Sequence, residues 1–320
     1  MKLTGNEWMG EAEARKSPAR VVLVGSDGRL GSALFGFLKH DHTVIPLGRG
    51  QLNLASESSI SDTLEALDYE FLFLTAALTG VDYCETHKQE AFAVNAAAAG
   101  RIAEISARKG AHMTYVSTDM VFDGNTELPY LETDKPGPIS VYGESKLKGE
   151  DYVIDTSETN LIVRVSWVFG PGRRAFPEWI VDQACSCSSV MLPADKIACP
   201  SYTLDLVSWM TMLVFGEAAG SAGGIFHLCN SSPCSWQEWG QFCIDTARAS
   251  GHPVIVGEIG GVPLDSVSAF VAHRPRNSSL NTAKFSRRIG IQPRHWDDAV
   301  HEYITGSNWR GSDVAESAGI

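Results

Sequence analysis

The fold is decided near the start of the chain, at Arg20-Val21-Val22-Leu23-Val24 followed at once by Gly25-Ser26-Asp27-Gly28-Arg29-Leu30-Gly31. The first of these segments is mostly apolar and β-branched, which predicts a short buried strand. Glycine then recurs at every third position and leads into a helical pattern. Glycine permits a tight turn and lets backbone N–H groups at a helix N-terminus approach a diphosphate. The first glycine spacing differs from the usual dinucleotide fingerprint, but its place after the first strand favours a dinucleotide site.

Strand-like and helical segments alternate outward from this turn. The strand-like runs are continuous and apolar, as in strands that are buried on both faces of a parallel sheet. Their alternation with helices predicts an α/β protein with a Rossmann-type, doubly wound parallel sheet. The expected strands are residues 20–24, 43–47, 70–75, 113–117 and 161–165, and the expected helices are residues 31–39, 88–109 and 141–154.

The pattern loosens after about Gly170, where short strands such as 224–228 alternate with helices such as 236–249. We expect this part to form a smaller C-terminal α/β domain that covers the substrate. The expected division of the chain is a flexible N-terminal extension at residues 1–18, an NAD(P)-binding domain at 19–170, a mainly substrate-binding domain at 171–306 and a flexible tail at 307–320.

Composition and charge exclude several classes of protein. With 320 residues, of which 44% are hydrophobic and 20% charged, the chain has the composition of a folded soluble protein. Its net charge of -12 argues against nucleic acid or an anionic membrane as a partner. No apolar run is long enough to span a membrane, and residues 1–20 lack the apolar core of a signal peptide, so we expect a cytoplasmic protein. The seven cysteines are scattered, which predicts reduced thiols, and no metal-binding motif is present.

Three residues in the middle of the chain form a candidate catalytic group. Thr118 follows the fourth expected strand, and Tyr142 and Lys146 stand four positions apart, so that both point from one face of a helix. A tyrosine has an ordinary pKa of about 10, and a neighbouring ammonium group favours the phenolate and lowers that pKa. A hydroxyl that fixes a carbonyl beside them completes a group suited to hydride transfer, in which the tyrosine protonates oxygen as hydride reaches carbon. A bare Tyr-x-x-x-Lys is common by chance, but its order after the glycine turn makes chance a minor explanation.

The end of the second expected strand bears on the choice of cofactor. A carboxylate there would bond the 2′-hydroxyl of the adenosine ribose and favour NAD. The chain has Gly48-Arg49 instead, with no acid until Glu57. Arg49 is equally compatible with a solvated surface position and with an ion pair to a 2′-phosphate. We therefore expect NADPH as the cofactor, with NADH as the alternative.

Several other residues have more than one interpretation. Trp167 fits either a core aromatic residue or a wall against a sugar or base. Arg274, in the cationic stretch Arg274-Pro275-Arg276-Asn277, fits either a surface turn or a grip on phosphates. Asp82 and Glu85 fit a solvated turn.

These motifs resemble the dTDP-4-dehydrorhamnose reductase family, within the extended short-chain dehydrogenases and reductases. The resemblance runs from about Arg20 to about Thr305. Its most specific part is Ser-Thr-Asp-x-Val-Phe-Asp-Gly at 117–124, followed by Tyr-Gly-x-Ser-Lys-Leu-x-Gly-Glu at 142–150. The other matching stretches are residues 25–31, 76–82, 164–169 and 274–280.

The resemblance implies reduction of a 4-keto-6-deoxy sugar nucleotide by NADPH or NADH, as in the formation of dTDP-L-rhamnose. It implies that Thr118, Tyr142 and Lys146 are catalytic, and it leaves the oligomeric state open, with a homodimer as one option. The implied cofactor-binding positions are Gly25, Gly28, Arg29, Leu30, Gly31, Ala76, Ala77, Thr79, Tyr142 and Lys146, and the implied substrate-binding positions are Met120, Trp167 and Arg274.

The chain departs from the family's pattern on the substrate side. Met120 stands where the family usually has Tyr, Ala175 where it has Asn, and the Asp-Gln-x-Gly-x-Pro-Thr stretch is replaced by residues 195–201. The exact substrate therefore stays open. A second resemblance, to the regulatory β subunit of methionine adenosyltransferase, rests on the shared fold and the Arg-Pro-Arg-Asn stretch. It implies a partner-binding subunit that keeps a nucleotide cofactor without catalysis.

Overall fold

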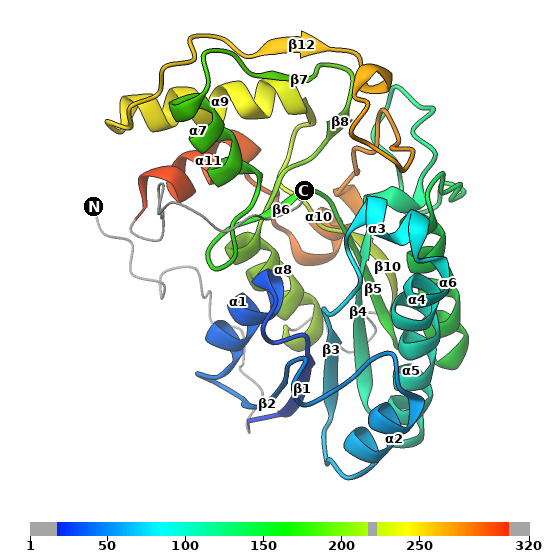
Figure 1. Ribbon diagram of the computed structural model, residues 1–320. Coiled ribbons are helices and arrows are strands. Elements are labelled where there is room, and N and C mark those ends of the chain that lie inside the picture. Colours follow the sequence, from blue (N-terminus) through cyan, green and yellow to red (C-terminus); the bar gives the residue numbers. More distant parts are fainter. Residues whose placement is uncertain (1–17, 217–222, 307–320) are drawn as a thin grey trace.

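A parallel sheet of six strands forms the centre of the computed structural model, which describes residues 18–216 and 223–306 (Figure 1). The strand order is β10-β5-β4-β3-β1-β2, so the chain winds outward from β1 in both directions. This confirms the expected α/β class and the doubly wound sheet. The expected flexible ends lie outside the described residues, except for Pro18. The strands are β1 (Arg20–Val24), β2 (Thr43–Leu47), β3 (Phe71–Leu74), β4 (His112–Thr118), β5 (Leu161–Val165) and β10 (Gly224–His227).

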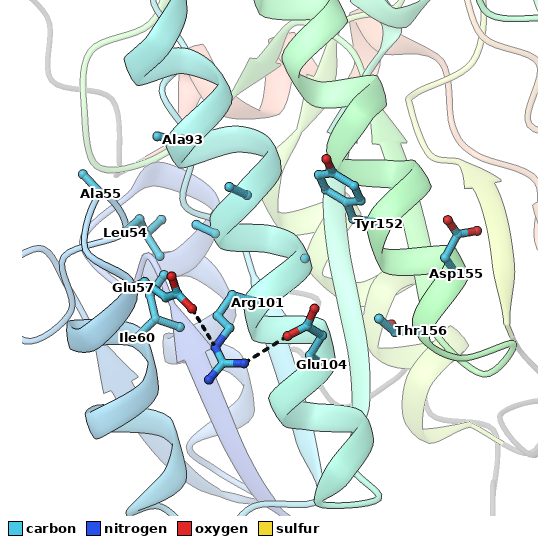
Figure 2. Close-up of a pocket in the computed structure, with 13 residues that line it drawn as sticks. Leu54, Ala55, Glu57, Ile60, Ala93, Arg101, Glu104, Tyr152, Asp155 and Thr156 are labelled. Atoms are coloured by element: carbon cyan, nitrogen blue, oxygen red, sulfur yellow. Dashed lines mark hydrogen bonds and ion pairs between the residues drawn. The ribbon is translucent and has the colours of Figure 1, made fainter.

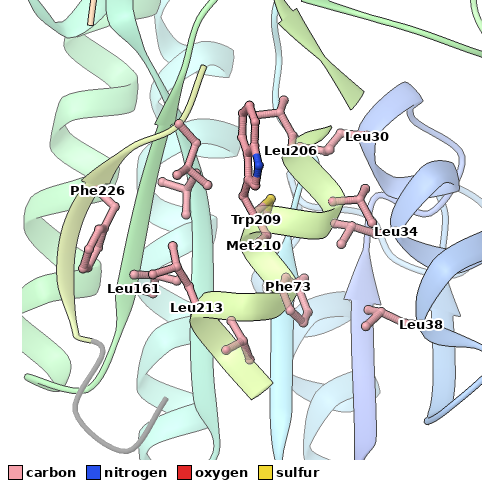
Figure 3. Close-up of a cluster of buried hydrophobic side chains, with 14 of the residues drawn as sticks. Leu30, Leu34, Leu38, Phe73, Leu161, Leu206, Trp209, Met210, Leu213 and Phe226 are labelled. Atoms are coloured by element: carbon pink, nitrogen blue, oxygen red, sulfur yellow. The ribbon is translucent and has the colours of Figure 1, made fainter. Parts of the chain in front are cut away.

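Helices cover both faces of this sheet because alternate strand residues point to opposite sides. In β1, Val21 and Leu23 belong to one apolar core, and Val22 and Val24 belong to the other. The first core lies beneath α1 (Arg29–Leu38), α8 (Thr203–Phe215) and α10 (Ala283–Ile289), and the second beneath α2 (Glu57–Glu65), α5 (Ala98–Arg108) and α6 (Val141–Thr156). Figure 3 shows side chains of α1 and α8 that meet over the sheet in the first core, among them Leu30, Leu34, Leu38, Leu206, Met210 and Leu213.

A smaller lobe carries a third apolar core (Figure 1). Its helices are α7 (Phe176–Ser186), α9 (Trp236–Ala249) and α11 (Trp296–Thr305). Between α7 and α9 the chain returns to the central sheet. There α8 and β10 add apolar side chains to the core under α1, and β10 pairs with β5. The division into two domains at residues 170 and 171 stays a prediction. The short strand pairs of this part are β6 (Val168–Phe169) with β9 (Ser201–Tyr202), β7 (Met191–Pro193) with β12 (Gly260–Val262), and β8 (Ile197–Ala198) with β11 (Cys234–Ser235).

The helix expected over residues 88–109 is interrupted in the structure. It consists of α4 (Lys88–Phe92), a π-helical turn at Ala93–Ala97 and α5. It follows the short helix α3 (Val81–Thr86). In the described ranges no helix is both long and apolar enough to cross a membrane, and all seven cysteines have free thiols, as expected.

Candidate active site

The glycine turn between β1 and α1 has the shape of a phosphate cradle. Gly25 has a φ of 95°, and a Cβ on it would lie 2.6 Å from the backbone nitrogen of Ala76. A Cβ on Gly31 would lie 2.0 Å from the carbonyl oxygen of Gly25, so both positions require glycine. Helix α1 has no acid in its first turn and no side-chain N-cap. Its first N–H groups therefore suit a diphosphate, and the turn fits a nicotinamide dinucleotide.

The guanidinium of Arg29 is bound to backbone carbonyl groups of the protein itself. It donates hydrogen bonds to the carbonyl oxygens of Val168 at 3.0 Å, Arg173 at 3.0 and 3.2 Å, and Arg174 at 2.5 Å. These bonds fasten the segment that contains β6 to the first turn of α1, and burial lowers the pKa of Arg29. A cofactor role for Arg29 and the neighbouring Leu30 therefore stays a prediction and falls to their backbone N–H groups.

The end of β2 has an acidic neighbour that the sequence pattern did not indicate. The carboxylate of Asp27 lies against Gly48, where a Cβ would come within 2.0 Å of its Oδ2 atom. It accepts a hydrogen bond of 3.3 Å from the backbone N–H of Arg49, whose side chain is exposed. The sequence argument looked for an acid after β2, but this one comes from the turn after β1. Because the two strands are neighbours, their carboxyl-end loops meet, which was the available signal.

Thr118 and Tyr142 meet where the end of β4 faces the first turn of α6. A Cβ on Gly143 would lie 2.2 Å from the carbonyl oxygen of Met120, so glycine allows the helix to approach the strand this closely. Ser140 caps the helix by accepting a hydrogen bond from the N–H of Gly143 at 3.2 Å. Burial raises the pKa of Tyr142 above its ordinary value, and the interaction with the Thr118 hydroxyl opposes that rise.

Lys146 lies one helical turn beyond Tyr142 and is only 1% exposed. Its Nζ atom donates to the carbonyl oxygen of Val116 at 2.8 Å and lies 3.9 Å from the centroid of the Tyr115 ring. Burial lowers the pKa of Lys146 to about 7, and nearby Glu150 opposes that shift. Burial of the phenol is the largest influence on the pKa of Tyr142 in this structure, and the expected lowering of that pKa by Lys146 stays a prediction.

Asn95 holds the expected cofactor loop, Ala76–Gly80, against α6. Its side chain accepts from the N–H of Leu78 at 2.8 Å and donates to the Leu78 carbonyl and the Ser145 hydroxyl at 3.0 Å each. It lies in the π-helical turn, and its own carbonyl accepts from the Tyr115 hydroxyl at 2.8 Å. The sequence analysis missed it, although an asparagine in the middle of an alanine-rich run was a signal. Asn95 thereby fixes the loop that contains Ala76, Ala77 and Thr79, whose cofactor contacts remain predictions.

On the substrate side, Trp167 stands in a backbone conformation that is rare for a residue with a side chain. Its φ is 40°. Its ring is stacked on Trp239, with centroids 5.3 Å apart, and lies 5.7 Å from Trp236. Met120 is buried at the end of β4, directly after the Thr118-Asp119 pair. Trp167 and Met120 therefore follow the ends of two neighbouring strands, β5 and β4.

Arg274 is held by an acid on the opposite lobe. Its Nη1 and Nη2 atoms donate to the two carboxylate oxygens of Asp82 at 3.0 and 2.7 Å, and its guanidinium lies 3.8 Å from the ring centroid of Phe270. Asp82 also accepts from the N–H groups of Val271 and Ala272, and the hydrogen bond from Arg274, together with these two, lowers its pKa. The expectation of a solvated turn is wrong for Asp82 because it binds the loop before Arg274. It is also wrong for Glu85, which accepts from the N–H of Val141, the first residue of α6, at 2.8 Å.

A cavity of about 500 Å³ lies away from this group, on the outer surface of α2, α5 and α6 (Figure 2). Arg101 lines it and donates to Glu104 at 3.0 Å. Tyr152, another lining residue, stands about 15 Å beyond Tyr142 along the helix. This cavity is therefore separate from the candidate catalytic group.

The structure brings the expected catalytic residues together at the carboxyl edge of the sheet. Thr118, Met120, Tyr142 and Lys146 gather between the end of β4 and α6, and Trp167 follows the neighbouring strand β5. Arg49 stands at the other side of the glycine turn, at the end of β2. Among the described residues no group of His, Cys, Asp and Glu side chains is arranged to hold a metal ion.

The comparisons with known proteins agree on one family. The model of the RmlD substrate binding domain matches residues 19–308. A dTDP-4-dehydrorhamnose reductase of Sinorhizobium fredii is 30% identical over 92% of this chain and 100% of its own length. The spore coat polysaccharide biosynthesis protein SpsK of Bacillus subtilis is 31% identical over 89% of this chain and 96% of its own. The crystal structure of dTDP-4-dehydrorhamnose reductase from Bacillus anthracis in complex with NADP is 26% identical and superposes with a TM-score of 0.83 over 89% of this chain and 98% of the other. The chain belongs to the dTDP-4-dehydrorhamnose reductase family of nicotinamide-dependent oxidoreductases.

Proposed function

We propose that the protein reduces the carbonyl group of a 4-keto-6-deoxy sugar nucleotide, with NADPH as its preferred cofactor. The observation that carries this proposal is the meeting of Tyr142 with Thr118, one helical turn from the buried Lys146 and at the same edge of the sheet as a glycine turn shaped for a diphosphate. The bound nicotinamide would supply the hydride. The protein's own residues would bind and orient the carbonyl and deliver the proton to its oxygen.

The raised pKa of Tyr142 suits a proton donor, because the phenol stays protonated at neutral pH until the substrate oxygen takes its proton. Thr118 would hold the carbonyl oxygen by a hydrogen bond. Lys146 uses one of its three N–H donors on Val116. Its other donors are available for the ribose next to the nicotinamide and for the phenolate that forms when Tyr142 gives up its proton.

Arg274 is our candidate for the substrate's diphosphate. An arginine has five N–H donors, and the contacts of Arg274 with Asp82 and with the carbonyl of Ala272 use its Nη1 protons and one on Nη2. The Nε proton and one Nη2 proton remain. Because Asp82 and Phe270 fix the plane of the guanidinium, those two donors point in a set direction before the substrate binds.

The preference for NADPH rests on Arg49, and Asp27 works against it. A guanidinium at the end of β2 can form an ion pair with a 2′-phosphate. The Asp27 carboxylate beside it would repel that phosphate and would accept a hydrogen bond from the 2′-hydroxyl of NADH. NADH is therefore the alternative cofactor.

The decisive experiment compares the native protein with Tyr142→Phe on a panel of 4-keto sugar nucleotides, following the loss of nicotinamide absorbance. The substitution removes only the hydroxyl, so kcat should fall by about 10²–10⁴-fold while cofactor affinity persists. Tyr152→Phe, on the exposed part of the same helix, is the matched control and should keep native turnover. Near-native turnover by Tyr142→Phe would contradict the mechanism. Cofactor binding by the native protein without turnover of any keto sugar would favour the regulatory-subunit alternative.

A further inference from the structure

A buried chain of polar side chains lies behind Thr118 and is not explained by the roles above. At its centre is the carboxylate of Asp119, a residue that is 4% exposed. Its Oδ1 atom accepts from the hydroxyl of Thr118 at 3.1 Å. Its Oδ2 atom accepts from the hydroxyls of Ser166 at 3.0 Å and Ser278 at 2.5 Å. Three hydroxyl groups from three separate segments of the chain thus converge on one carboxylate.

The series of hydrogen bonds that starts at Thr118 ends at the buried ammonium group of Lys196. Lys196 is 2% exposed, and its Nζ atom lies 2.8 Å from the Oγ atom of Ser278. A serine hydroxyl has a single proton, and that of Ser278 goes to Asp119, so the Ser278 oxygen accepts from Lys196. The direction of each bond is thereby fixed from Lys196 through Ser278 to Asp119. A buried positive charge compensates a buried negative one through a single hydroxyl.

The same accounting constrains Thr118. Its hydroxyl oxygen accepts from the N–H of Met120 at 3.2 Å, and its only proton is donated to Asp119, with the neighbouring oxygen of Tyr142 as a competing acceptor. To hold a substrate carbonyl, Thr118 must turn that proton from Asp119 to the substrate oxygen. How readily it does so depends on how strongly Asp119 attracts the proton. An ammonium group that is linked to the other oxygen of the same carboxylate weakens that attraction.

We propose that Lys196 is a positioning residue that acts through Ser278 and Asp119 to free the hydroxyl proton of Thr118 for the carbonyl oxygen of the substrate. This inference rests on the proposed reductase function. Lys196 itself is 2% exposed, and its Nζ atom donates to Ser278 and lies over the ring of Trp167, 5.7 Å from the centroid. The competing explanation is that these hydrogen-bonded side chains have only a structural role in packing.

The test is a pair of double-mutant cycles on the active enzyme. Lys196→Met removes the charge, and Ser278→Ala removes only the bridging hydroxyl, which keeps the test valid if the first variant does not fold. Each should lower kcat by about 10- to 100-fold, the loss of one hydrogen bond to a charged group, and leave KM and the cofactor dissociation constant within about twofold. Ser279→Ala is the matched control, because this neighbouring buried hydroxyl donates to Asn277 and not to Asp119. It should keep native turnover.

The cycles are closed by making each change in a Thr118→Val background. If Lys196 and Ser278 act through the Thr118 proton, removing them from Thr118→Val lowers kcat no further. If each change lowers kcat by the same factor with and without Thr118, or if Ser278→Ala behaves like Ser279→Ala, the inference is overturned and the proposed function stands. Absence of turnover by the native protein on every 4-keto sugar nucleotide would overturn both.

Discussion

Replacing Lys146 by Met should stabilise the folded protein while it removes activity. The lysine pKa falls from 10.5 to about 7 on burial, which corresponds to on the order of 5 kcal/mol of unfavourable free energy at neutral pH. Methionine has a similar length, carries no charge and fills the same space over Tyr115. It leaves the Val116 carbonyl without its donor, which costs about 1–3 kcal/mol. The free energy of unfolding should therefore rise by on the order of 2 kcal/mol, while kcat falls and the cofactor binds less tightly.

The pH dependence of this gain follows from the sign of the shift. Above the unfolded pKa of 10.5 the lysine is neutral in both states, and the two proteins should be equally stable with respect to this group. As the pH falls toward about 7, the unfolded chain takes up a proton that the folded protein does not, so native stability falls. The advantage of Lys146→Met should thus be fully present at and below about pH 7 and fade toward pH 10.5.

Urea unfolding followed by tryptophan fluorescence at several pH values measures this gain. Lys148→Met is the control, because its ammonium is on the same helix, is 44% exposed and lies 3.6 Å from Asp151. It should change stability by less than about 0.5 kcal/mol at any pH. A Lys146→Met protein that is less stable than native at neutral pH, or whose gain does not shrink as the pH rises, would refute the claim that Lys146 is held against a burial penalty.

Three further predictions concern the cofactor, the substrate and the packing of α6. Arg49→Ala should weaken NADPH by about 1.5–3 kcal/mol and leave NADH nearly unchanged, whereas Asp27→Asn should shift preference toward NADPH. Fluorescence titration with both cofactors decides this, and equal losses for the two would exclude a 2′-phosphate contact. Asp82→Asn should raise KM for the sugar nucleotide with a smaller change in kcat in steady-state assays, and an effect confined to kcat would remove the diphosphate role. Gly143→Ala should lower the free energy of unfolding in urea by about 1–3 kcal/mol. The control Gly36→Ala, in an open position of α1, should raise it by about 0.5–1 kcal/mol. An unchanged stability of Gly143→Ala would show that the contact with Met120 yields easily.

The sheet and the proximity of Thr118, Tyr142 and Lys146 were predictable because their signals are local. Residues 21–24 are apolar without interruption, and the structure divides them between the two cores on the two faces of the sheet. Tyr142 and Lys146 lie on one helix, so their spacing alone places them together. Thr118 is placed beside them by its position at the end of a strand. That placement requires only a parallel sheet, which the alternation of strands and helices already predicts.

The residues that the sequence analysis missed owe their positions to contacts between distant segments. Asp27 reaches the end of β2 from the turn after another strand. Asn95 bonds to Leu78, which lies 17 residues earlier in the chain. The π-helical turn that carries Asn95 interrupts a segment whose sequence predicts a regular helix. The rise in the pKa of Tyr142 has the same origin, because packing of α6 against β4 buries the phenol. Whether a lysine stabilises a phenolate depends on where its Nζ atom lies, and that was set by the carbonyl of Val116 on a strand.

This chain departs from its family's pattern at positions that we expect on the substrate side, and hydrogen bonds link one of those positions to Thr118. Residues 195–201 replace the family's usual stretch, and within them Lys196 is linked through Ser278 to Asp119, which accepts the proton of Thr118. Met120 follows that same acid in sequence, and its carbonyl lies against the helix that carries Tyr142. Under the proposed mechanism, a change of these residues would alter the position of the Thr118 proton and of α6 as well as the shape around the sugar. It follows that substitutions that move this enzyme toward another sugar should change kcat along with KM.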